Sequence, residues 1–371
     1  MKCNNGLANS SPPGCPPECP GCDHRLLSEE ASRRQKEGWL RSALAPWRER
    51  FEPMQALPDG AWRGYRSRVT LHLRWREGWQ AGLLRRDELI PIPGCPVHAP
   101  LINRSLELLL PRLPEPGRFP LAWWVQSGAQ LTLVLRSHRE PPLEWLDERT
   151  LRHLEESGLE GLWINLHPAT GRRLFAKRGW RLLWGREWSR DAMGNLHGPA
   201  SFRQLSGDIA RRAIDRAEAH LRPERGEGVV DLYCGIGSTL RRWRERGSEA
   251  VGVELGGEAA ACARENAPGA TVLRGCCAQR LPQLESWLEE MGGRRVVAYL
   301  NPPRTGLEEE VVAWLVRHRD RFSRLAYLSC SAGTQRRDLE RLEVGGYGVE
   351  ALAPFDFFPR TRHVENLALL A

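Results

Sequence analysis

A cysteine and a glutamate near the carboxyl end of the chain are the residues best suited to covalent chemistry. Cys330 ends the apolar run LAYLSC, and Glu365 leads into the apolar final run NLALL. A thiolate can act as a nucleophile, and a carboxylate facing the same cleft can act as a base. The alternatives are a small buried hydrophobic side chain and a solvated surface acid. Because doubly wound enzymes place reactive groups at strand ends, the position of Cys330 favours a nucleophile.

Three other strand ends predict a site for a nucleoside cofactor. The segment DLYCGIGS, residues 231–238, follows a strand, and its Gly235 and Gly237 would let the backbone approach a ligand. The next strand ends in Glu254, whose carboxylate can bond both hydroxyls of a ribose. The fourth strand runs into Asn301 and two prolines, which fix the asparagine amide toward the cleft. A merely structural turn is the alternative for the glycine segment, which lacks the full dinucleotide fingerprint.

Four cysteines crowd the first 22 residues, and a fifth lies in a Pro-Gly-Cys-Pro turn. The spacing is Cys15-x3-Cys19-x2-Cys22, with Cys3 upstream and Cys95 downstream. The surrounding prolines and glycines exclude a helix or a strand, so the loop needs an external hold such as a metal. Cys15, Cys19, Cys22 and Cys95 supply four thiolates, enough for a four-iron, four-sulfur cluster (4Fe-4S) or for zinc. Spacing alone does not choose between them, nor between Cys3 and Cys15 as the first ligand.

The rhythm of the chain predicts two domains with a boundary near residue 196. Residues 196–371 repeat an apolar strand followed by a helical segment, which is typical of a Rossmann-like, doubly wound α/β sheet. Residues 1–195 combine a helical stretch at 26–47 with short apolar runs, which indicates a smaller α+β domain. We expect the first domain to carry the cysteine cluster and to recognise the substrate.

The charge pattern favours a polyanionic partner. The net charge is +8, and residues 1–200 carry 29 Lys and Arg against 22 Asp and Glu, whereas the remainder carries 25 against 24. Arginine and aromatic residues alternate between Trp62 and Trp79, a pattern that can bind phosphates and stack on bases, although tryptophan is more often buried core. A GC-rich genome would also produce an arginine bias. No apolar run is long enough to cross a bilayer, and no secretory signal is present, so we expect a cytoplasmic protein.

At this point five motifs, in order, resemble the RNA 5-methyluridine methyltransferase family: DLYCGIG, GVE, NPPRTGL, LSCSAGT and FFPRTRHVE. The segments PASFRQ (199–204) and GYRSR (64–68) extend the resemblance over nearly the whole chain. It implies an S-adenosylmethionine-dependent enzyme that methylates carbon 5 of a uridine in RNA. By this similarity Cys330 is the nucleophile and Glu365 the base, and the cofactor site is lined by Gln204, Tyr233, Glu254 and Asn301.

The chain departs from the family pattern at several positions. Many members have aspartate in place of Asn301 and asparagine in place of Ser331, Arg203 replaces an aromatic residue, and Cys276 or Cys277 replaces an acid. Shorter rRNA-type members share the Asn-Pro-Pro form, so the resemblance favours 23S rRNA over tRNA as the substrate of a monomeric enzyme. Several members bind a 4Fe-4S cluster through three early cysteines and one in a later Cys-Pro, which favours that cluster over zinc.

Three alternatives belong to other classes. The C-x3-C-x2-C spacing is also that of radical S-adenosylmethionine enzymes, but those require a strand before the motif, where this chain has a proline-rich loop. Asn-Pro-Pro followed by an aromatic residue is typical of exocyclic-amine methyltransferases, but here Arg304 follows. An RNA-binding metal protein without activity would leave Cys330 and Glu365 unexplained.

Overall fold

The computed structural model describes residues 11–168, 173–201 and 207–371. The chain divides into two compact units, of which the first comprises residues 1–28, 59–191 and 197–200 and the second residues 29–58, 192–196 and 201–371. Residues 29–58 therefore lie with the carboxyl-terminal residues, whereas the sequence had grouped them with the first domain. The predicted domains, residues 1–195 and 196–371, are each one continuous segment. A prediction of this kind cannot place residues 29–58 in the second unit.

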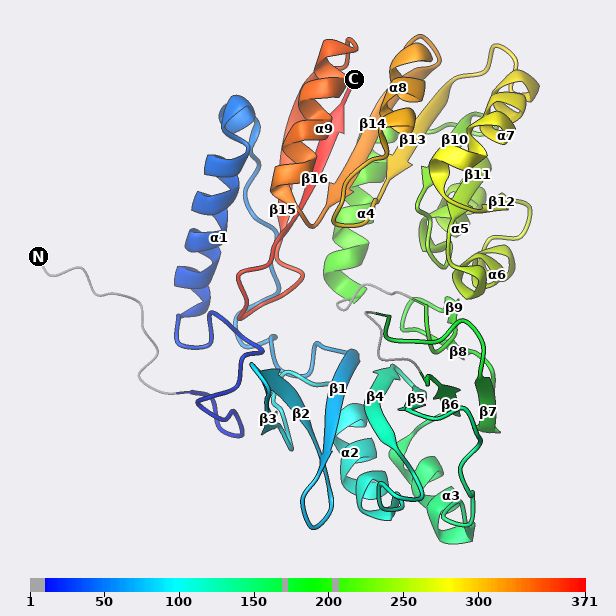
Figure 1. Cartoon of the computed structure of the whole chain (residues 1–371). Coiled ribbons are helices and arrows are strands. Elements are labelled where there is room, and N and C mark those ends of the chain that lie inside the picture. Colours follow the sequence, from blue (N-terminus) through cyan, green and yellow to red (C-terminus); the bar gives the residue numbers. More distant parts are fainter. Residues whose placement is uncertain (1–10, 169–172, 202–206) are drawn as a thin grey trace, which may run out of the picture. The chain divides into compact units, whose positions relative to one another are not determined.

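The first unit is built on a seven-stranded sheet in the order β3-β2-β1-β4-β5-β6-β7 (Figure 1). All neighbouring strands are antiparallel except β5 and β6, which are parallel. Helices α2 (Pro100–Leu109) and α3 (Glu148–Ser157) pack on one another, and their apolar residues share one core with the sheet. The strands are β1 (Arg68–Trp75), β2 (Trp79–Arg85), β3 (Glu88–Pro91), β4 (Leu121–Ser127), β5 (Gln130–Leu135), β6 (Gly161–Leu166) and β7 (Trp180–Gly185).

The second unit contains the predicted α/β sheet, with the order β12-β11-β10-β13-β14-β16-β15. The five strands from β12 to β14 in this order pair in parallel, and β16 runs antiparallel to both of its neighbours, so six of the seven strands share one direction. This inserted antiparallel strand is the feature that the strand–helix rhythm did not predict. The strands are β10 (Gly228–Leu232), β11 (Glu249–Glu254), β12 (Thr271–Arg274), β13 (Val296–Leu300), β14 (Phe322–Ser329), β15 (Val349–Phe355) and β16 (Glu365–Leu370).

Helices cover both faces of this second sheet, because its strands are apolar on both sides. One apolar core includes α4 (Gly207–Leu221), α5 (Ser238–Glu245) and α6 (Gly257–Asn266). The other includes α1 (Glu29–Ala43), α7 (Cys277–Glu290), α8 (Glu309–Arg317) and α9 (Ala332–Val344). Two 3-10 helices, η1 (Ala45–Arg50) and η2 (Leu110–Arg112), and a small sheet of β8 (Ser189–Arg190) and β9 (Leu196–His197) complete the described elements.

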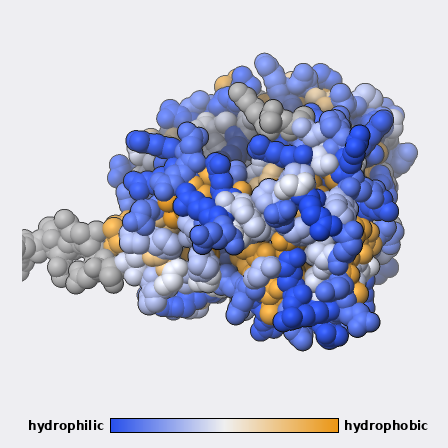
Figure 2. All heavy atoms as spheres, turned by 60° about the horizontal axis from the view of Figure 1, so that its bottom comes forward, coloured by the Kyte–Doolittle hydropathy of each residue, from blue (hydrophilic) through white to orange (hydrophobic). Residues whose placement is uncertain are grey.

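Hydrophilic residues cover most of the molecular face drawn in Figure 2, and the hydrophobic areas between them are smaller and separate. Within the described ranges no helix is both long enough and apolar enough to span a membrane.

Candidate active site

Cys330 lies between the end of β14 and the start of α9. The thiol is half-buried, and the preceding residue fixes the local turn, because Ser329 Oγ accepts a hydrogen bond from the Ser331 amide at 3.1 Å. Burial, followed by the charge of Glu365, raises the pKa of the Cys330 thiol above its ordinary value of 9.0. Arg304 opposes this rise through its positive charge and a hydrogen bond to the thiol. The Cys330 thiol, the Glu365 carboxylate and the Arg304 guanidinium therefore lie close together.

The antiparallel direction of β16 explains why Glu365 reaches Cys330. In the register of β14 and β16, Ser329 pairs with Asn366, so the residue after Ser329 comes opposite the residue before Asn366. A parallel strand at this place would have put its first residue at the other edge of the sheet. Glu365 is buried, with only 4% of its surface exposed, and its charge also acts on the Tyr299 hydroxyl. The predicted proximity of Glu365 and Cys330 is thus present in the structure.

A pair of buried amides locks the two strands together behind this site. Gln335 of α9 donates to the backbone oxygens of Tyr327 and Asn366 at 3.1 and 3.0 Å, and it accepts from the Asn366 side chain at 2.9 Å. Both residues are at most 1% exposed. Sequence reasoning missed them, although Asn366 is a polar residue within an apolar strand. These hydrogen bonds fix the spacing between β14, which leads to Cys330, and β16, which begins with Glu365.

The glycine-containing loop after β10 takes a backbone shape that few residues adopt. Tyr233, Gly235 and Gly237 have φ values of +61°, +57° and +78°. A side chain at Gly237 would come within 2.9 Å of Ala263 on α6, whereas a Cβ at Gly235 would meet nothing within 4 Å. The first glycine of the loop therefore borders open space where a ligand fits, and the second lets the loop pack on α6.

Glu254, at the end of β11, holds this loop from the side. Its carboxylate accepts from the backbone amides of Gly235 at 3.1 Å and Gly256 at 2.5 Å. Each carboxylate oxygen keeps a further lone pair, which remains usable for a ribose hydroxyl. The hydroxyl of Tyr233, in the same loop, donates to Glu308 at 2.7 Å. Gln204, predicted to contact the cofactor, lies outside the described residues, as do Arg203 and Cys3.

Asn301 begins the loop that carries Arg304. Its backbone amide donates to Leu232 O at 3.2 Å, so the loop starts beside the end of β10. Helix α9 holds the rest of the loop, because Asp338 accepts from the Leu307 amide at 2.8 Å and Thr334 donates to Arg304 O at 3.2 Å. Since α9 begins at Ala332, two residues after Cys330, one helix positions both Cys330 and Arg304.

The first unit brings the four predicted metal-binding cysteines together. Cys19 is buried and Cys15, Cys22 and Cys95 are half-buried. Burial raises the pKa of Cys22 to about 11, Arg66 lowers it, and the charges of Cys95, Cys19 and Cys15 raise it further. Such mutual effects require thiols that are near one another. Within residues 11–168, 173–201 and 207–371, however, no three Cys, His, Asp or Glu side chains are arranged to hold one metal ion.

The aromatic residues proposed to stack on bases separate into two groups. Trp62 and Tyr65 are buried and belong to the core rather than to a binding face. Trp75 is 42% exposed at the end of the β1–β2 hairpin, where it packs edge-to-face on Trp79 between the exposed Arg74 and Arg76. Only the hairpin end therefore offers a side chain for stacking from this set.

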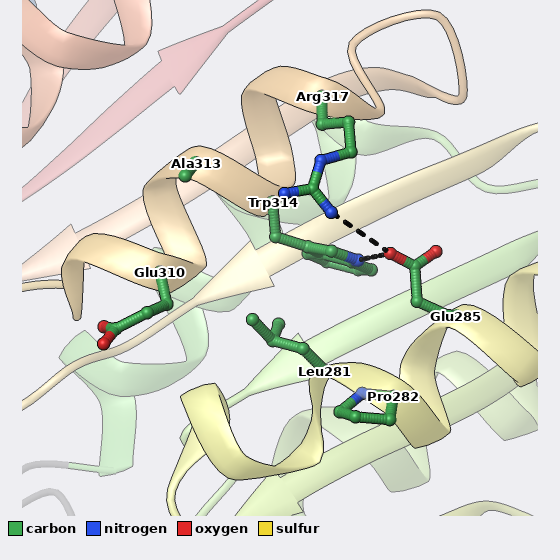
Figure 3. A pocket seen from close by; sticks show the side chains of 7 residues that line it. All are labelled: Leu281, Pro282, Glu285, Glu310, Ala313, Trp314 and Arg317. Carbon is green, nitrogen blue, oxygen red and sulfur yellow. Dashed lines mark hydrogen bonds and ion pairs between the residues drawn. The ribbon is translucent and has the colours of Figure 1, made fainter.

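A separate groove lies between α7 and α8 (Figure 3). Glu285 is one of the residues that line it. Its carboxylate accepts from Trp314 Nε1 at 3.0 Å, bonds to His318 Nε2 at 2.9 Å and lies 4.0 Å from the Arg317 guanidinium. None of the predicted site residues lines it. The engaged carboxylate marks a packing contact between two helices rather than a second active site.

Comparison with known proteins agrees with this geometry. The family described as tRNA (Uracil-5-)-methyltransferase matches residues 293–371, the stretch that contains Asn301, Cys330 and Glu365. Enzymes named 23S rRNA (uracil(1939)-C(5))-methyltransferase RlmD, from Hahella chejuensis and Thiobacillus denitrificans, are 28% and 29% identical to the chain. Both alignments cover 95% of this chain and 81% and 83% of those proteins.

A solved structure has the same fold over almost the whole chain. Pyrococcus abyssi tRNA (uracil-54, C5)-methyltransferase in complex with S-adenosyl-L-homocysteine superposes with a TM-score of 0.71 at 20% identity, covering 96% of this chain and 86% of that one. Fold, site and comparisons together define an S-adenosylmethionine-dependent RNA methyltransferase. Residues 293–371 in particular match the uracil-5-methyltransferase family, and the two bacterial relatives are named as enzymes that act on a uracil of 23S rRNA.

Proposed function

We propose that this enzyme methylates carbon 5 of one uridine in 23S rRNA through a covalent adduct on Cys330, with Glu365 as the base. The observation that carries the proposal is the pairing of β14 with the antiparallel β16, which sets a buried carboxylate beside a half-buried thiol. The relatives named as 23S rRNA enzymes support rRNA as the substrate. The proposal includes a monomeric enzyme in the cytoplasm.

The chemistry requires both groups. Carbon 5 of uracil is a poor nucleophile, and addition of the Cys330 thiolate to carbon 6 converts the ring into an enolate whose carbon 5 can attack a methyl group. Arg304 favours the thiolate through its hydrogen bond and charge. Glu365 then takes the proton from carbon 5, the electron pair of that bond restores the ring double bond, and the thiolate leaves carbon 6.

The loop after β10 fits S-adenosylmethionine, which supplies the sulfonium methyl group when bound. Gly235 borders open space, and Glu254 has acceptor capacity left for the ribose hydroxyls. We propose that Tyr233, Gly237, Asn301 and Gln204 complete the site. Asn301 starts its loop beside the end of β10, which supports a contact to both cofactor and substrate.

We also propose that Cys15, Cys19, Cys22 and Cys95 hold a 4Fe-4S cluster. The donor set is all thiolate, which suits iron–sulfur clusters and zinc alike. A zinc ion needs its thiolates at about 2.3 Å from one centre, whereas a cubane holds them at separate corners. The charges of Cys15, Cys19 and Cys95 act on Cys22, as expected for four thiols that share one site. No step of the methyl transfer uses the cluster.

Two variants test the mechanism at different steps. With 23S rRNA transcribed in vitro and radiolabelled S-adenosylmethionine, Glu365→Gln is expected to accumulate a methylated protein–RNA adduct that survives denaturing electrophoresis. Cys330→Ala is expected to give neither adduct nor product. If Cys330→Ala still forms 5-methyluridine, the covalent mechanism is wrong.

The substrate is tested separately. Nucleoside mapping of RNA from a strain lacking the protein should show loss of 5-methyluridine at one position of 23S rRNA. Loss from tRNA instead would support the tRNA enzyme, the reaction named for the Pyrococcus abyssi structure.

A further inference from the structure

A buried ion pair joins α1 to the segment that leads into Glu365. Lys36 Nζ donates to Asp356 Oδ1 at 2.7 Å and to Phe358 O at 3.0 Å. The lysine side chain is 0% exposed and that of the aspartate 7%. Lysine is almost never fully buried, and the enclosed charge is tolerable only because it is paired and hydrogen-bonded. The mechanism proposed above gives this pair no role.

The pair is attached at the base of the β15–β16 connection. Asp356 directly follows Phe355, and Phe355 is the register partner of Glu365 in the pairing of β15 with β16. The segment that returns to β16 turns on Phe358, whose carbonyl oxygen accepts from Lys36, from the Thr361 amide at 3.2 Å and from Thr361 Oγ1 at 2.8 Å. Lys36 thus bonds to both the start of the connection and its turn.

A second contact fixes the strand on which this connection begins. Both contacts are between backbone atoms. The Gln55 carbonyl oxygen accepts from the Asp356 N–H at 2.8 Å, and the Gln55 N–H donates to the Pro354 carbonyl oxygen at 2.9 Å. The segment around Gln55 is tied back to α1, because Glu37 accepts from the Met54 amide at 3.3 Å. Helix α1 therefore contacts the end of β15 directly through Lys36 and indirectly through Glu37 and the segment around Gln55. Of these contacts, the one made by Lys36 reaches the turn at Phe358.

Cys330 is held by other means. It lies beside the Ser329–Ser331 turn and just before α9, and the hydrogen bonds between Gln335 and Asn366 join β16 to α9 at the second residue of the strand. Glu365 is the first residue of β16, between these hydrogen bonds and the connection that Lys36 bonds. A change at Lys36 should therefore move the carboxylate more than the thiol.

We propose that Lys36 is a positioning residue that, by clamping Asp356 and Phe358, aims the Glu365 carboxylate at the carbon-5 proton of the covalent intermediate. The inference rests on the proposed role of Glu365. Methyl transfer needs the thiol and the cofactor loop, but collapse of the adduct needs the carboxylate in line with the proton. Loss of the clamp should therefore slow the last step selectively.

The experiment compares Lys36→Met with Arg34→Met. Both remove a cation from α1, but Arg34 forms an exposed pair with Glu30. With 23S rRNA transcribed in vitro and radiolabelled S-adenosylmethionine, single-turnover methyl transfer by Lys36→Met should stay within about threefold of wild type. Release of methylated RNA from the adduct should slow by about tenfold or more, so the methylated adduct accumulates on denaturing gels. Arg34→Met should behave as wild type.

Lys36→Met leaves Asp356 as an unpaired buried charge, which opposes folding. A double variant without that charge, Lys36→Met with Asp356→Leu, is therefore measured in parallel. Accumulation of methylated adduct by either folded variant supports the proposal. Equal loss of methyl transfer and release, with no adduct, overturns it and leaves the pair a structural one. Glu365→Gln is the reference: if it accumulates adduct and the Lys36 variants do not, only the positioning role fails, and if it does not, the role of Glu365 fails as well.

Discussion

At the scale of single residues, the reactivity of Cys330 depends on its burial and on two charged neighbours that act in opposite directions. Burial and Glu365 raise the pKa of the thiol, and Arg304 lowers it. The thiolate fraction grows with pH, so adduct formation should accelerate as pH rises through the alkaline range. Glu365, the proposed base, should thus slow formation of the adduct, and Arg304 should compensate in part.

Arg304→Ala should raise the pKa of Cys330 further. We expect adduct formation at pH 8 to slow, because less of the thiol is ionised, and the difference from wild type to shrink as the pH rises. Single-turnover adduct formation measured across pH gives the comparison, with the exposed Arg317→Ala as the control. A deficit that does not change with pH would mean that Arg304 acts on the RNA rather than on the thiol.

Asp231 offers a prediction about stability. It is a fully buried residue of β10, just before the loop that contains Gly235 and Gly237, and its Oδ2 accepts from Trp243 Nε1 at 3.3 Å. Burial raises the pKa of Asp231 to about 7. Between the ordinary value of 3.8 and about 7, the folded state binds a proton that the unfolded state has released, so stability falls as pH rises through this window. Above it the penalty is complete.

Asp231→Asn removes this penalty. We expect the variant to gain about 1–3 kcal/mol relative to wild type at pH 8 and little at pH 4. Urea unfolding at several pH values measures the difference, and the exposed Asp320→Asn is the control. A constant effect across pH would show that hydrogen bonding rather than ionisation dominates at this position.

At the scale of elements, the cofactor loop depends on one close approach. Gly237→Ala combines a positive φ with a contact at 2.9 Å to Ala263 on α6, and should destabilise the protein by about 2–4 kcal/mol. Gly333→Ala, in the first turn of α9, meets nothing within 4 Å and should change stability by less than about 1 kcal/mol. Thermal unfolding compares the two. Equal effects would contradict the packing of the loop on α6.

The elements also separate what sequence can predict from what it cannot. Cys330, Glu254 and Asn301 were predictable because each follows a local apolar run, and parallel strands bring their carboxyl ends to one edge. The antiparallel insertion of β16 was not, since no local pattern states a strand's direction. Nor was the pairing of Lys36 with Asp356, residues 320 positions apart whose contact exists only in the folded chain.

At the scale of the whole molecule, the first unit should carry the metal cluster. Anaerobically purified protein is expected to be brown with about four irons per chain, and Cys19→Ala should lose the colour because a cubane needs all its thiolates. Cys276→Ala, which changes a half-buried cysteine of the second unit, should retain it. Iron and zinc analysis decides the matter, and stoichiometric zinc without iron would contradict the cluster.

The two units should also divide the ligands between them. Glu254→Ala removes the carboxylate that holds the cofactor loop, so S-adenosylmethionine affinity should fall by about tenfold or more while RNA affinity stays within about twofold. Trp75→Ala removes the exposed ring of the β1–β2 hairpin and should have the reverse effect, since stacking on a base contributes about 1–3 kcal/mol. Trp39→Ala, which removes another exposed ring, from α1 of the second unit, should change neither affinity. Calorimetry with S-adenosylmethionine and filter binding with 23S rRNA measure the two affinities for all three variants. Parallel losses of both affinities in Glu254→Ala would contradict the assignment of cofactor binding to one unit and RNA binding to the other.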